Sequence, residues 1–208
     1  MKVKICGITD VNTGIQAVHY GADAIGLVFA ESKRRVSVEL AKEIAESLPP
    51  DVYKVGVFVN ETHEEIDRIA SFAGLTHIQL HGDETAEYSQ SLSYPVIKAV
   101  SFQGNEPLAN IGDFPADYIL LDSPKGKYRG GNGTVFDWHE VNTNLLANKK
   151  IILAGGLHID NVEQAIRIIK PYMVDVSSGV ESNGVKDLEK IKAFIAKAKG
   201  IAVGGEMK

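Results

Sequence analysis

One cysteine stands near the start of the chain, at the end of a short apolar run. The sequence opens MKVKICGITD, and Cys6 is the only cysteine among 208 residues. A thiolate is both a nucleophile and a base, so a lone thiol at a strand end is a candidate catalytic group. Buried cysteine is also common as ordinary packing, so the other polar groups that the fold brings beside it must decide its role.

Acidic and imidazole groups end or follow other apolar runs. Asp122 ends YILLD, His81 follows HIQL, and Asp175 lies within MVDV. Carboxyl and imidazole groups are the common general acids and bases of enzymes. A structural interpretation remains for each, because Asp122 could start a turn at the following Ser-Pro and Asp175 could form an internal ion pair with Lys4.

Two late segments have the composition of an anion site. LAGGL carries Gly155 and Gly156, and VDVSSGVE carries Ser177, Ser178 and Gly179. Glycines let backbone N–H groups approach a ligand, and serine hydroxyls add donors for phosphate oxygens. Paired glycines also make simple tight turns. We favour phosphate binding, because both segments follow consecutive strands near the end of the chain.

Three further segments carry weaker signals. Arg34, within SKRR, could hold a carboxylate or an aromatic face from a loop. Gly126–Thr134, GKYRGGNGT, lacks the ending of a nucleotide P-loop and is interpreted as a flexible loop that could act as a lid. His77 and His81 have no evident third ligand, so we expect no metal site.

The elements that would position these residues alternate along the chain. Short β-branched runs are followed by segments with helical spacing, which indicates a parallel sheet with helical crossovers. The predicted strands are Val3–Cys6, Ala24–Phe29, Tyr53–Val59, His77–Leu80, Val96–Val100, Tyr118–Leu121, Ile151–Leu153 and Met173–Val176. The predicted helices include Val38–Ser47, Glu64–Phe72, Glu84–Leu92, Asn161–Ile169 and Leu188–Lys197.

Local signals support some helices better than others. Thr62 precedes Glu65 at capping-box spacing, and Ser37 or Asp83 could cap the helix that follows it. The helical signal is poor around Glu106–Ile111 and Asp137–Ala147.

Eight strand–helix units predict an α/β fold, the (β/α)8 TIM barrel, as a single compact domain with short loops. The chain is short for that fold, which typically has about 250 residues, and an open doubly wound sheet is the rival. We expect the barrel to span residues 1–200 and residues 201–208 to form a C-terminal tail. Alternation along each strand would turn Lys4, Cys6, Asp122 and Asp175 inward, toward the carboxyl ends where barrel enzymes bind substrates.

Composition excludes several classes of partner. The formal net charge is −5 and no basic block occurs, so we expect neither nucleic acid nor a membrane surface as a partner. No run approaches the roughly 18 apolar residues of a membrane span. A single cysteine and an N-terminus without a signal peptide predict a cytoplasmic protein.

The chain resembles the phosphoribosylanthranilate isomerase family of tryptophan biosynthesis over about residues 2–200. The motifs that carry the resemblance keep their order, namely KICGIT, SKRRVS, QLHG, LLD, FDW, AGGL and VDVSSGVE. The resemblance implies a (β/α)8 barrel without metal or organic cofactor and an N-(5-phosphoribosyl)anthranilate substrate. The implied reaction is an Amadori rearrangement, in which an aminoaldose becomes an aminoketose.

By motif match, Cys6 is the general base and Asp122 the general acid. The same match places Arg34 at the anthranilate group, His81 and Asp175 beside the substrate, and the segments at 155–156 and 177–179 around the phosphate. A thiol gains as a base from a nearby cation, for which Lys4 is the candidate.

The rival functions are another phosphosugar barrel enzyme, such as an isomerase of histidine biosynthesis or a neighbouring tryptophan-pathway lyase, and a non-catalytic sensor of a phosphate ligand. Both the monomer and the homodimer remain open.

Overall fold

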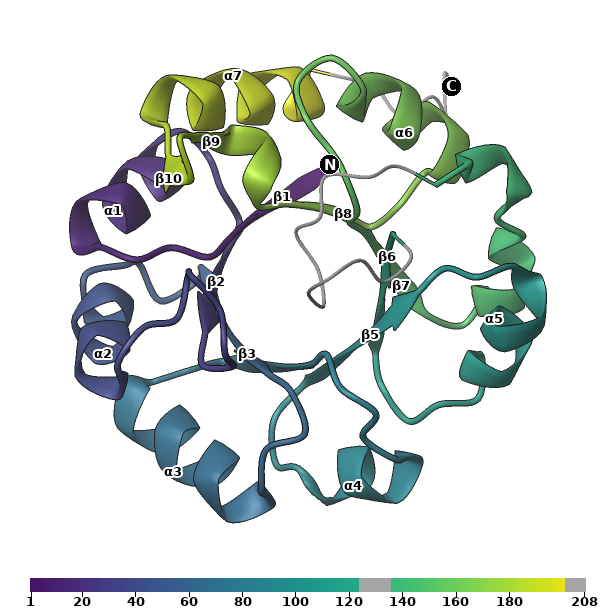
Figure 1. Cartoon of the computed structure of the whole chain (residues 1–208), viewed down its shortest axis with the longest axis horizontal. Helices are drawn as coiled ribbons and strands as arrows, with labels where there is room; N and C mark the ends of the chain where they lie inside the picture. Colours follow the sequence, from purple (N-terminus) through teal and green to yellow (C-terminus); the bar gives the residue numbers. More distant parts are fainter. Residues whose placement is uncertain (124–135, 201–208) are drawn as a thin grey trace.

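The computed structural model describes residues 1–123 and 136–200. Its eight long strands are all parallel and form a closed barrel in chain order, with β1 paired to β8. Figure 1 looks down the barrel and shows the helices as an outer ring. The strands are β1 (Lys2–Cys6), β2 (Ala24–Val28), β3 (Tyr53–Phe58), β4 (His77–Leu80), β5 (Val96–Ser101), β6 (Tyr118–Asp122), β7 (Lys150–Leu153) and β8 (Met173–Val176). The predicted TIM barrel is therefore confirmed.

The helices of the outer ring differ in length. The described ones are α1 (Val11–His19), α2 (Val38–Glu46), α3 (His63–Ala73), α4 (Ala86–Ser91), α5 (Asn105–Ile111), α6 (Val162–Ile169) and α7 (Leu188–Lys199). The caps follow the sequence signals at α2 and α3, where Ser37 and Thr62 accept hydrogen bonds from the Leu40 and Glu65 N–H groups. Gly74 ends α3 in the left-handed conformation, at φ 66°.

One sequence-based expectation about the helices is wrong, and one segment with a poor helical signal forms no α-helix. Asp83 does not cap α4, because Thr85 takes that place and accepts from the Tyr88 N–H. No α-helix forms over Asp137–Ala147. Instead, two short 3₁₀ helices occupy the segment, η1 (Trp138–Glu140) and η2 (Thr143–Leu146), and buried Trp138 and Leu146 anchor them to the core. The region near Glu106 does form a short α-helix, α5.

The strands divide the interior into two apolar regions. Residues such as Val3, Ile78 and Val174 face outward and belong to the large core beneath the helices. The second region lies inside the barrel and includes Tyr118, Leu120, Ile152 and Met173. Polar side chains complete the inner face nearer the carboxyl ends of the strands, and Lys4, Gln79, Asp122 and Asp175 are all buried there. Alternation of side chains along each strand produces this arrangement.

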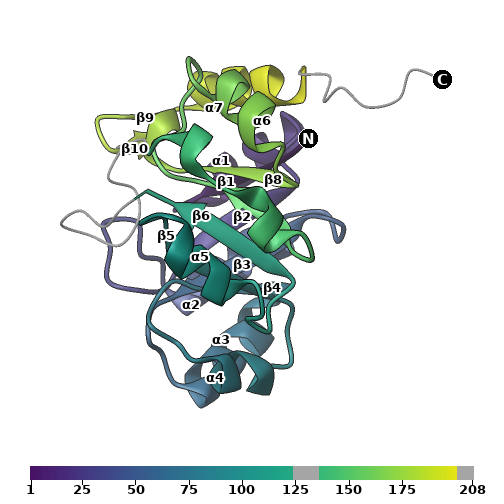
Figure 2. The same ribbon diagram turned by 90° about the vertical axis from the view of Figure 1, so that its right-hand side faces the viewer.

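The carboxyl ends of the strands form one face of the barrel. After β8 the chain forms a short 3₁₀ helix, η3 (Ser178–Val180), and a two-stranded hairpin, β9 (Glu181–Ser182) and β10 (Val185–Lys186). Figure 2 shows the barrel from the side, with the hairpin and the N-terminus at opposite ends. Side chains at the ends of β1, β6 and β8 therefore meet at the hairpin's end of the barrel.

We predict that Phe194→Ala lowers the free energy of unfolding by about 3–5 kcal/mol, because Phe194 on α7 is fully buried and its loss leaves a cavity. Phe72→Ala is the matched control, since its ring on α3 is 47% exposed, and it should cost less than about 1 kcal/mol. Urea unfolding of both variants measures the difference. Equal losses would contradict this placement of α7.

Candidate active site

A buried ion pair lies at the junction of the first and last strands. Lys4 Nζ is 3.0 Å from Asp175 Oδ1, and the two residues are direct partners in the β1–β8 register. Lys4 is fully buried and Asp175 nearly so. Burial by itself lowers the pKa of Lys4, but the negative charges of Asp175 and Cys6 raise it above its ordinary value. Lys4 is therefore a charged ammonium inside the barrel.

Cys6 ends β1 on the same side of the strand as Lys4. Cys6 is half-buried as a residue, and the Lys4 ammonium lies close enough to lower the pKa of its thiol. On the neighbouring strand β2, a Cβ added to Gly26 would lie 2.7 Å from Cys6 Sγ and 3.1 Å from Lys4 Nζ. Only a residue without a side chain leaves room there for both groups. The sequence-based placement of Lys4 beside Cys6 is confirmed.

The environment of Cys6 contains competing influences. Burial raises the pKa of the Cys6 thiol, and the carboxylate of Asp175 raises it too. The ammonium groups of Lys4 and Lys186 lower it, but the net pKa stays above the ordinary value. The expectation that Lys4 assists ionisation therefore holds for the direction of its own effect. It does not hold for the net result, because burial and Asp175 outweigh the cations.

Asp122 ends β6 with both carboxylate oxygens engaged. Its Oδ1 accepts from the Ser123 N–H at 2.8 Å, and its Oδ2 lies 3.4 Å from His81 Nε2. Gln79 Nε2 lies 3.1 Å from His81 Nδ1. The Gln79 amide nitrogen faces Nδ1, which leaves Nε2 as the ring nitrogen that faces Asp122. The side chain of Gln79 thus fixes which nitrogen of His81 meets the carboxyl group.

Cys6 and Asp122 stand on separated strands of the ring. The barrel order places β7 and β8 between β6 and β1 on one side, and β2 to β5 on the other. Both residues are the last of their strands, so a small molecule at the mouth would lie between a thiol and a carboxyl group. This arrangement suits proton transfers at two positions of one substrate.

The two glycine and serine segments meet beside Asp122. Gly155 and Gly156 have φ values of 81° and 63°, a region that favours glycine. A Cβ on Gly155 would clash with the Ser123 backbone nitrogen, and one on Gly179 would clash with the Leu157 carbonyl oxygen. The turn after β7 therefore packs directly against both β6 and the segment after β8. Ser178 and Gly179 lie in η3, and the Ser177 hydroxyl donates to the Cys6 carbonyl at 3.0 Å.

Arg34 reaches the mouth from the segment after β2. Its Nε and Nη2 form a two-point ion pair with Glu181, at 2.6 and 3.0 Å. A Cβ on Gly7, which has φ 77°, would clash with the Arg34 side chain, so this guanidinium stem crosses the backbone just after Cys6. Lys186 Nζ binds the other side of Glu181 at 2.8 Å.

The sequence of this chain is similar to those of known proteins. A family model described as N-(5'-phosphoribosyl)anthranilate (PRA) isomerase matches residues 3–197. An N-(5'-phosphoribosyl)anthranilate isomerase of Bacillus cereus strain G9842 is 56% identical over 200 residues, covering 96% of this chain and 98% of that protein. The chain belongs to the phosphoribosylanthranilate isomerase family.

Solved structures of phosphoribosylanthranilate isomerases have the same fold. The Thermotoga maritima protein is 43% identical, with a TM-score of 0.88 over 97% of this chain and all of that one. A second structure, 41% identical with a TM-score of 0.85 over 97% of this chain and all of that one, holds reduced 1-(o-carboxyphenylamino)-1-deoxyribulose 5-phosphate. A further solved structure is of monomers generated from the dimeric Thermotoga maritima phosphoribosylanthranilate isomerase. For this chain, a monomer or a homodimer stays a prediction.

Three residues of the candidate site in this chain were not identified from the sequence. The sequence patterns assign no role to Gln79, Glu181 or Lys186. A signal for the last two exists, because Asn183-Gly184 is a typical two-residue hairpin turn and would bring them opposite each other. The proposed lid, Gly126–Thr134, lies outside the described residues.

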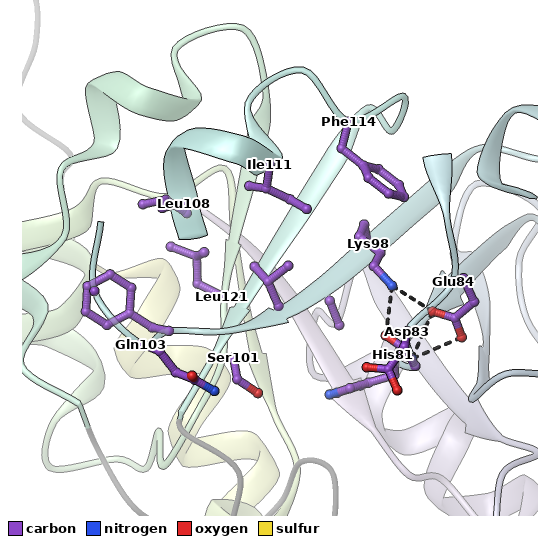
Figure 3. A pocket seen from close by; sticks show the side chains of 15 residues that line it. His81, Asp83, Glu84, Lys98, Ser101, Gln103, Leu108, Ile111, Phe114 and Leu121 are labelled. Carbon is purple, nitrogen blue, oxygen red and sulfur yellow. Dashed lines mark hydrogen bonds and ion pairs between the residues drawn. The ribbon is translucent and has the colours of Figure 1, made fainter. Parts of the chain in front are cut away.

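A side cavity of about 350 Å³ adjoins the mouth between α4 and α5. Figure 3 shows apolar Leu108 and Ile111 on one side and Lys98 with Glu84 on the other, and the Phe114 ring lies beside Lys98. Lys98 Nζ bonds Glu84 Oε2 at 2.7 Å and the Gly82 carbonyl at 2.9 Å, so this buried pair is internally satisfied. Within residues 1–123 and 136–200, no group of three His, Cys, Asp or Glu side chains is arranged to hold a metal ion. None of the helices described there is both long and apolar enough to span a membrane.

We predict that the pKa of Cys6 responds in opposite directions to its two neighbours. Lys4→Met should raise the pKa, because it removes the adjacent cation, and Asp175→Asn should lower it, because it removes an anion. The pH dependence of Cys6 alkylation measures both shifts, and circular dichroism checks that each variant folds. Movement of both variants in the same direction would contradict this account of the thiol's environment.

Proposed function

We propose that the chain is the phosphoribosylanthranilate isomerase of tryptophan biosynthesis, with Cys6 and Asp122 as its general base and general acid. The reaction is an intramolecular oxidoreduction that converts N-(5-phosphoribosyl)anthranilate to 1-(2-carboxyphenylamino)-1-deoxyribulose 5-phosphate. The observation that most directly supports this proposal is that a thiol and a carboxyl group end β1 and β6 at one mouth, beside two packed glycine turns. The single cysteine of the chain fits the cytoplasm, where we place the enzyme.

Asp122 starts the reaction as the acid. Its proton goes to the furanose ring oxygen, the bond from that oxygen to C1′ breaks, and the anilino nitrogen's electron pair forms a Schiff base. The carboxylate left behind accepts a hydrogen bond from the Ser123 N–H and faces His81 Nε2 at 3.4 Å, which limits the free-energy cost of the new charge. His81 thus contributes by stabilising Asp122 after proton transfer.

Cys6 then acts as the base. Its thiolate takes the proton from C2′, and the electrons of that C–H bond move toward the Schiff base to give an enolamine. The enolamine tautomerises to the ketone, and exchange with solvent returns Cys6 and Asp122 to their starting protonation states. Because the pKa of Cys6 is raised in the free protein, the cation Lys4 has to supply part of the stabilisation of the thiolate.

The remaining predicted residues bind the two ends of the substrate. The backbone around Gly155, Gly156 and Gly179, with Ser177 and Ser178, would surround the phosphate. Arg34 would contact the anthranilate group, since its Nη1 lies outside the two-point pair with Glu181. Asp175 contributes through Lys4, with which it forms the ion pair beside Cys6.

We predict that Cys6→Ala and Asp122→Asn each lower kcat by about 100- to 10,000-fold, the usual range for losing one general acid or base. Both substitutions should preserve the fold, and each removes one group that transfers a proton. The assay follows the fall in fluorescence as phosphoribosylanthranilate is converted.

Binding of a reduced product analogue provides the control for these two variants. Each should bind it within a few-fold of wild type, which separates loss of chemistry from loss of the site. Near-normal kcat in either variant would remove that residue from its proposed role.

We predict that Gly179→Ala raises KM more than it lowers kcat. The added methyl group would meet the Leu157 carbonyl oxygen and force apart the two turns proposed to hold phosphate. Competitive inhibition by inorganic phosphate should weaken in parallel by about tenfold or more. Gly74→Ala serves as a control for a glycine substitution, because nothing lies within 4 Å of its added Cβ and it ends α3 away from these turns.

A further inference from the structure

We propose that Glu181 and Lys186 form a positioning pair, which orients Arg34 for the substrate and supports the strand end that carries Cys6. The inference deepens the proposed function and rests on it for the role of Arg34. Neither residue touches the reacting atoms in this proposal. Both act through the groups that they hold.

A small hairpin sets the two residues face to face. Ser182 pairs with Val185 and Glu181 with Lys186, and the loop between them is Asn183-Gly184. Both loop residues have positive φ, 52° and 81°, as a tight type I′ hairpin turn requires. The turn therefore fixes the register that brings the Lys186 ammonium to 2.8 Å from the Glu181 carboxylate.

Glu181 gathers cations from two distant parts of the chain. Its carboxylate binds Arg34 through two nitrogens, Lys186 at 2.8 Å and the exposed Lys33 at 3.3 Å. Burial alone would raise the pKa of Glu181, but the hydrogen bonds from Arg34 and Lys186 lower it to about 2. The two-point contact fixes the plane of the Arg34 guanidinium, which a single hydrogen bond would leave free to rotate.

Lys186 joins this carboxylate to the ends of β8 and β1. Its buried Nζ donates to the Ser177 carbonyl at 3.0 Å and to the Ser177 hydroxyl at 3.3 Å. That hydroxyl in turn donates to the carbonyl of Cys6. The charged groups that act on the thiol are Lys4 on β1, Asp175 on β8 and Lys186 on β10, so Lys186 is the second cation of the Cys6 environment.

The composition of this cluster argues against a purely structural purpose. Charged groups buried together gain little net stability, because desolvation offsets their attraction, and apolar replacements are often as stable. A hairpin needed only for packing would not require a buried lysine and glutamate. The pair instead fixes the orientation of the Arg34 guanidinium and the position of the Ser177 backbone carbonyl at the mouth.

The two halves of the pair should give different kinetic signatures. Glu181→Gln keeps the shape but releases Arg34, so KM should rise about tenfold with a smaller change in kcat. Lys186→Met removes a cation near Cys6, so the midpoint of Cys6 alkylation should move to higher pH and kcat should fall more than KM rises. Lys186→Arg should restore most of the alkylation midpoint, because it keeps the charge.

Lys33→Met is the matched control. Lys33 contacts the same carboxylate from the solvent side, at 59% exposure, so its loss should leave KM, kcat and the alkylation midpoint unchanged. If Lys186→Met does not fold, Lys186→Gln replaces it in the comparison with Lys186→Arg.

The alkylation measurement needs no catalytic activity, so it tests Lys186 even if the wild-type chain lacks isomerase activity, a result that would overturn the proposed function alone. The positioning role is overturned if Glu181→Gln leaves KM unchanged, or if the alkylation midpoint is the same in the lysine, arginine and uncharged variants. Parallel losses of stability and of both kinetic constants, without a midpoint shift, would show a structural role only.

Discussion

The ion pair of Lys4 and Asp175 is the interaction on which the rest of the site depends. The two residues are 171 positions apart in the chain, yet they are register partners where β1 closes the barrel against β8. Removing two charges from water is costly, and their attraction compensates only when the geometry is close. Any other register of β1 against β8 would leave a buried ammonium and a buried carboxylate unpaired. The observed register also places Cys6 beyond Lys4 and fixes the electrostatic environment of its thiol.

The inner face of the barrel changes character along its length. Its lower part is filled by apolar side chains such as Leu120, Ile152 and Met173, which form a packed plug. Above the plug the barrel presents the buried polar groups of Lys4, Gln79, Asp122 and Asp175 to the mouth. A rigid apolar base beneath a polar rim holds proton-transferring groups still, which lowers the reorganisation needed during reaction. The apolar residues that stabilise the inside of the barrel are thus distinct from the polar residues that face the mouth.

The sequence predicts the parts of this structure that repeat and misses those that depend on single distant contacts. The strand His77–Leu80 is predicted at its observed bounds, because apolar runs bounded by turn residues carry their own signal. Asp83 and Thr85 are both plausible caps, and only the turn before α4 decides between them. The pairing of Arg34 with Glu181 joins residues 147 positions apart, so no local pattern reveals it. The proposed roles of Cys6 and Asp122 come from the family resemblance, and the barrel places both residues at the ends of separate strands that open at one mouth.

Charge at the mouth is balanced rather than strongly positive. Lys4 is matched by Asp175, and Arg34 and Lys186 share Glu181, so the described cations of the site are largely neutralised by their own carboxylates. A substrate with a phosphate and a carboxylate would then be recognised by the orientation of hydrogen-bond donors more than by the net charge of the site. In the proposed site, backbone N–H groups at the glycine turns and one oriented guanidinium would supply that orientation without strong attraction for unrelated anions.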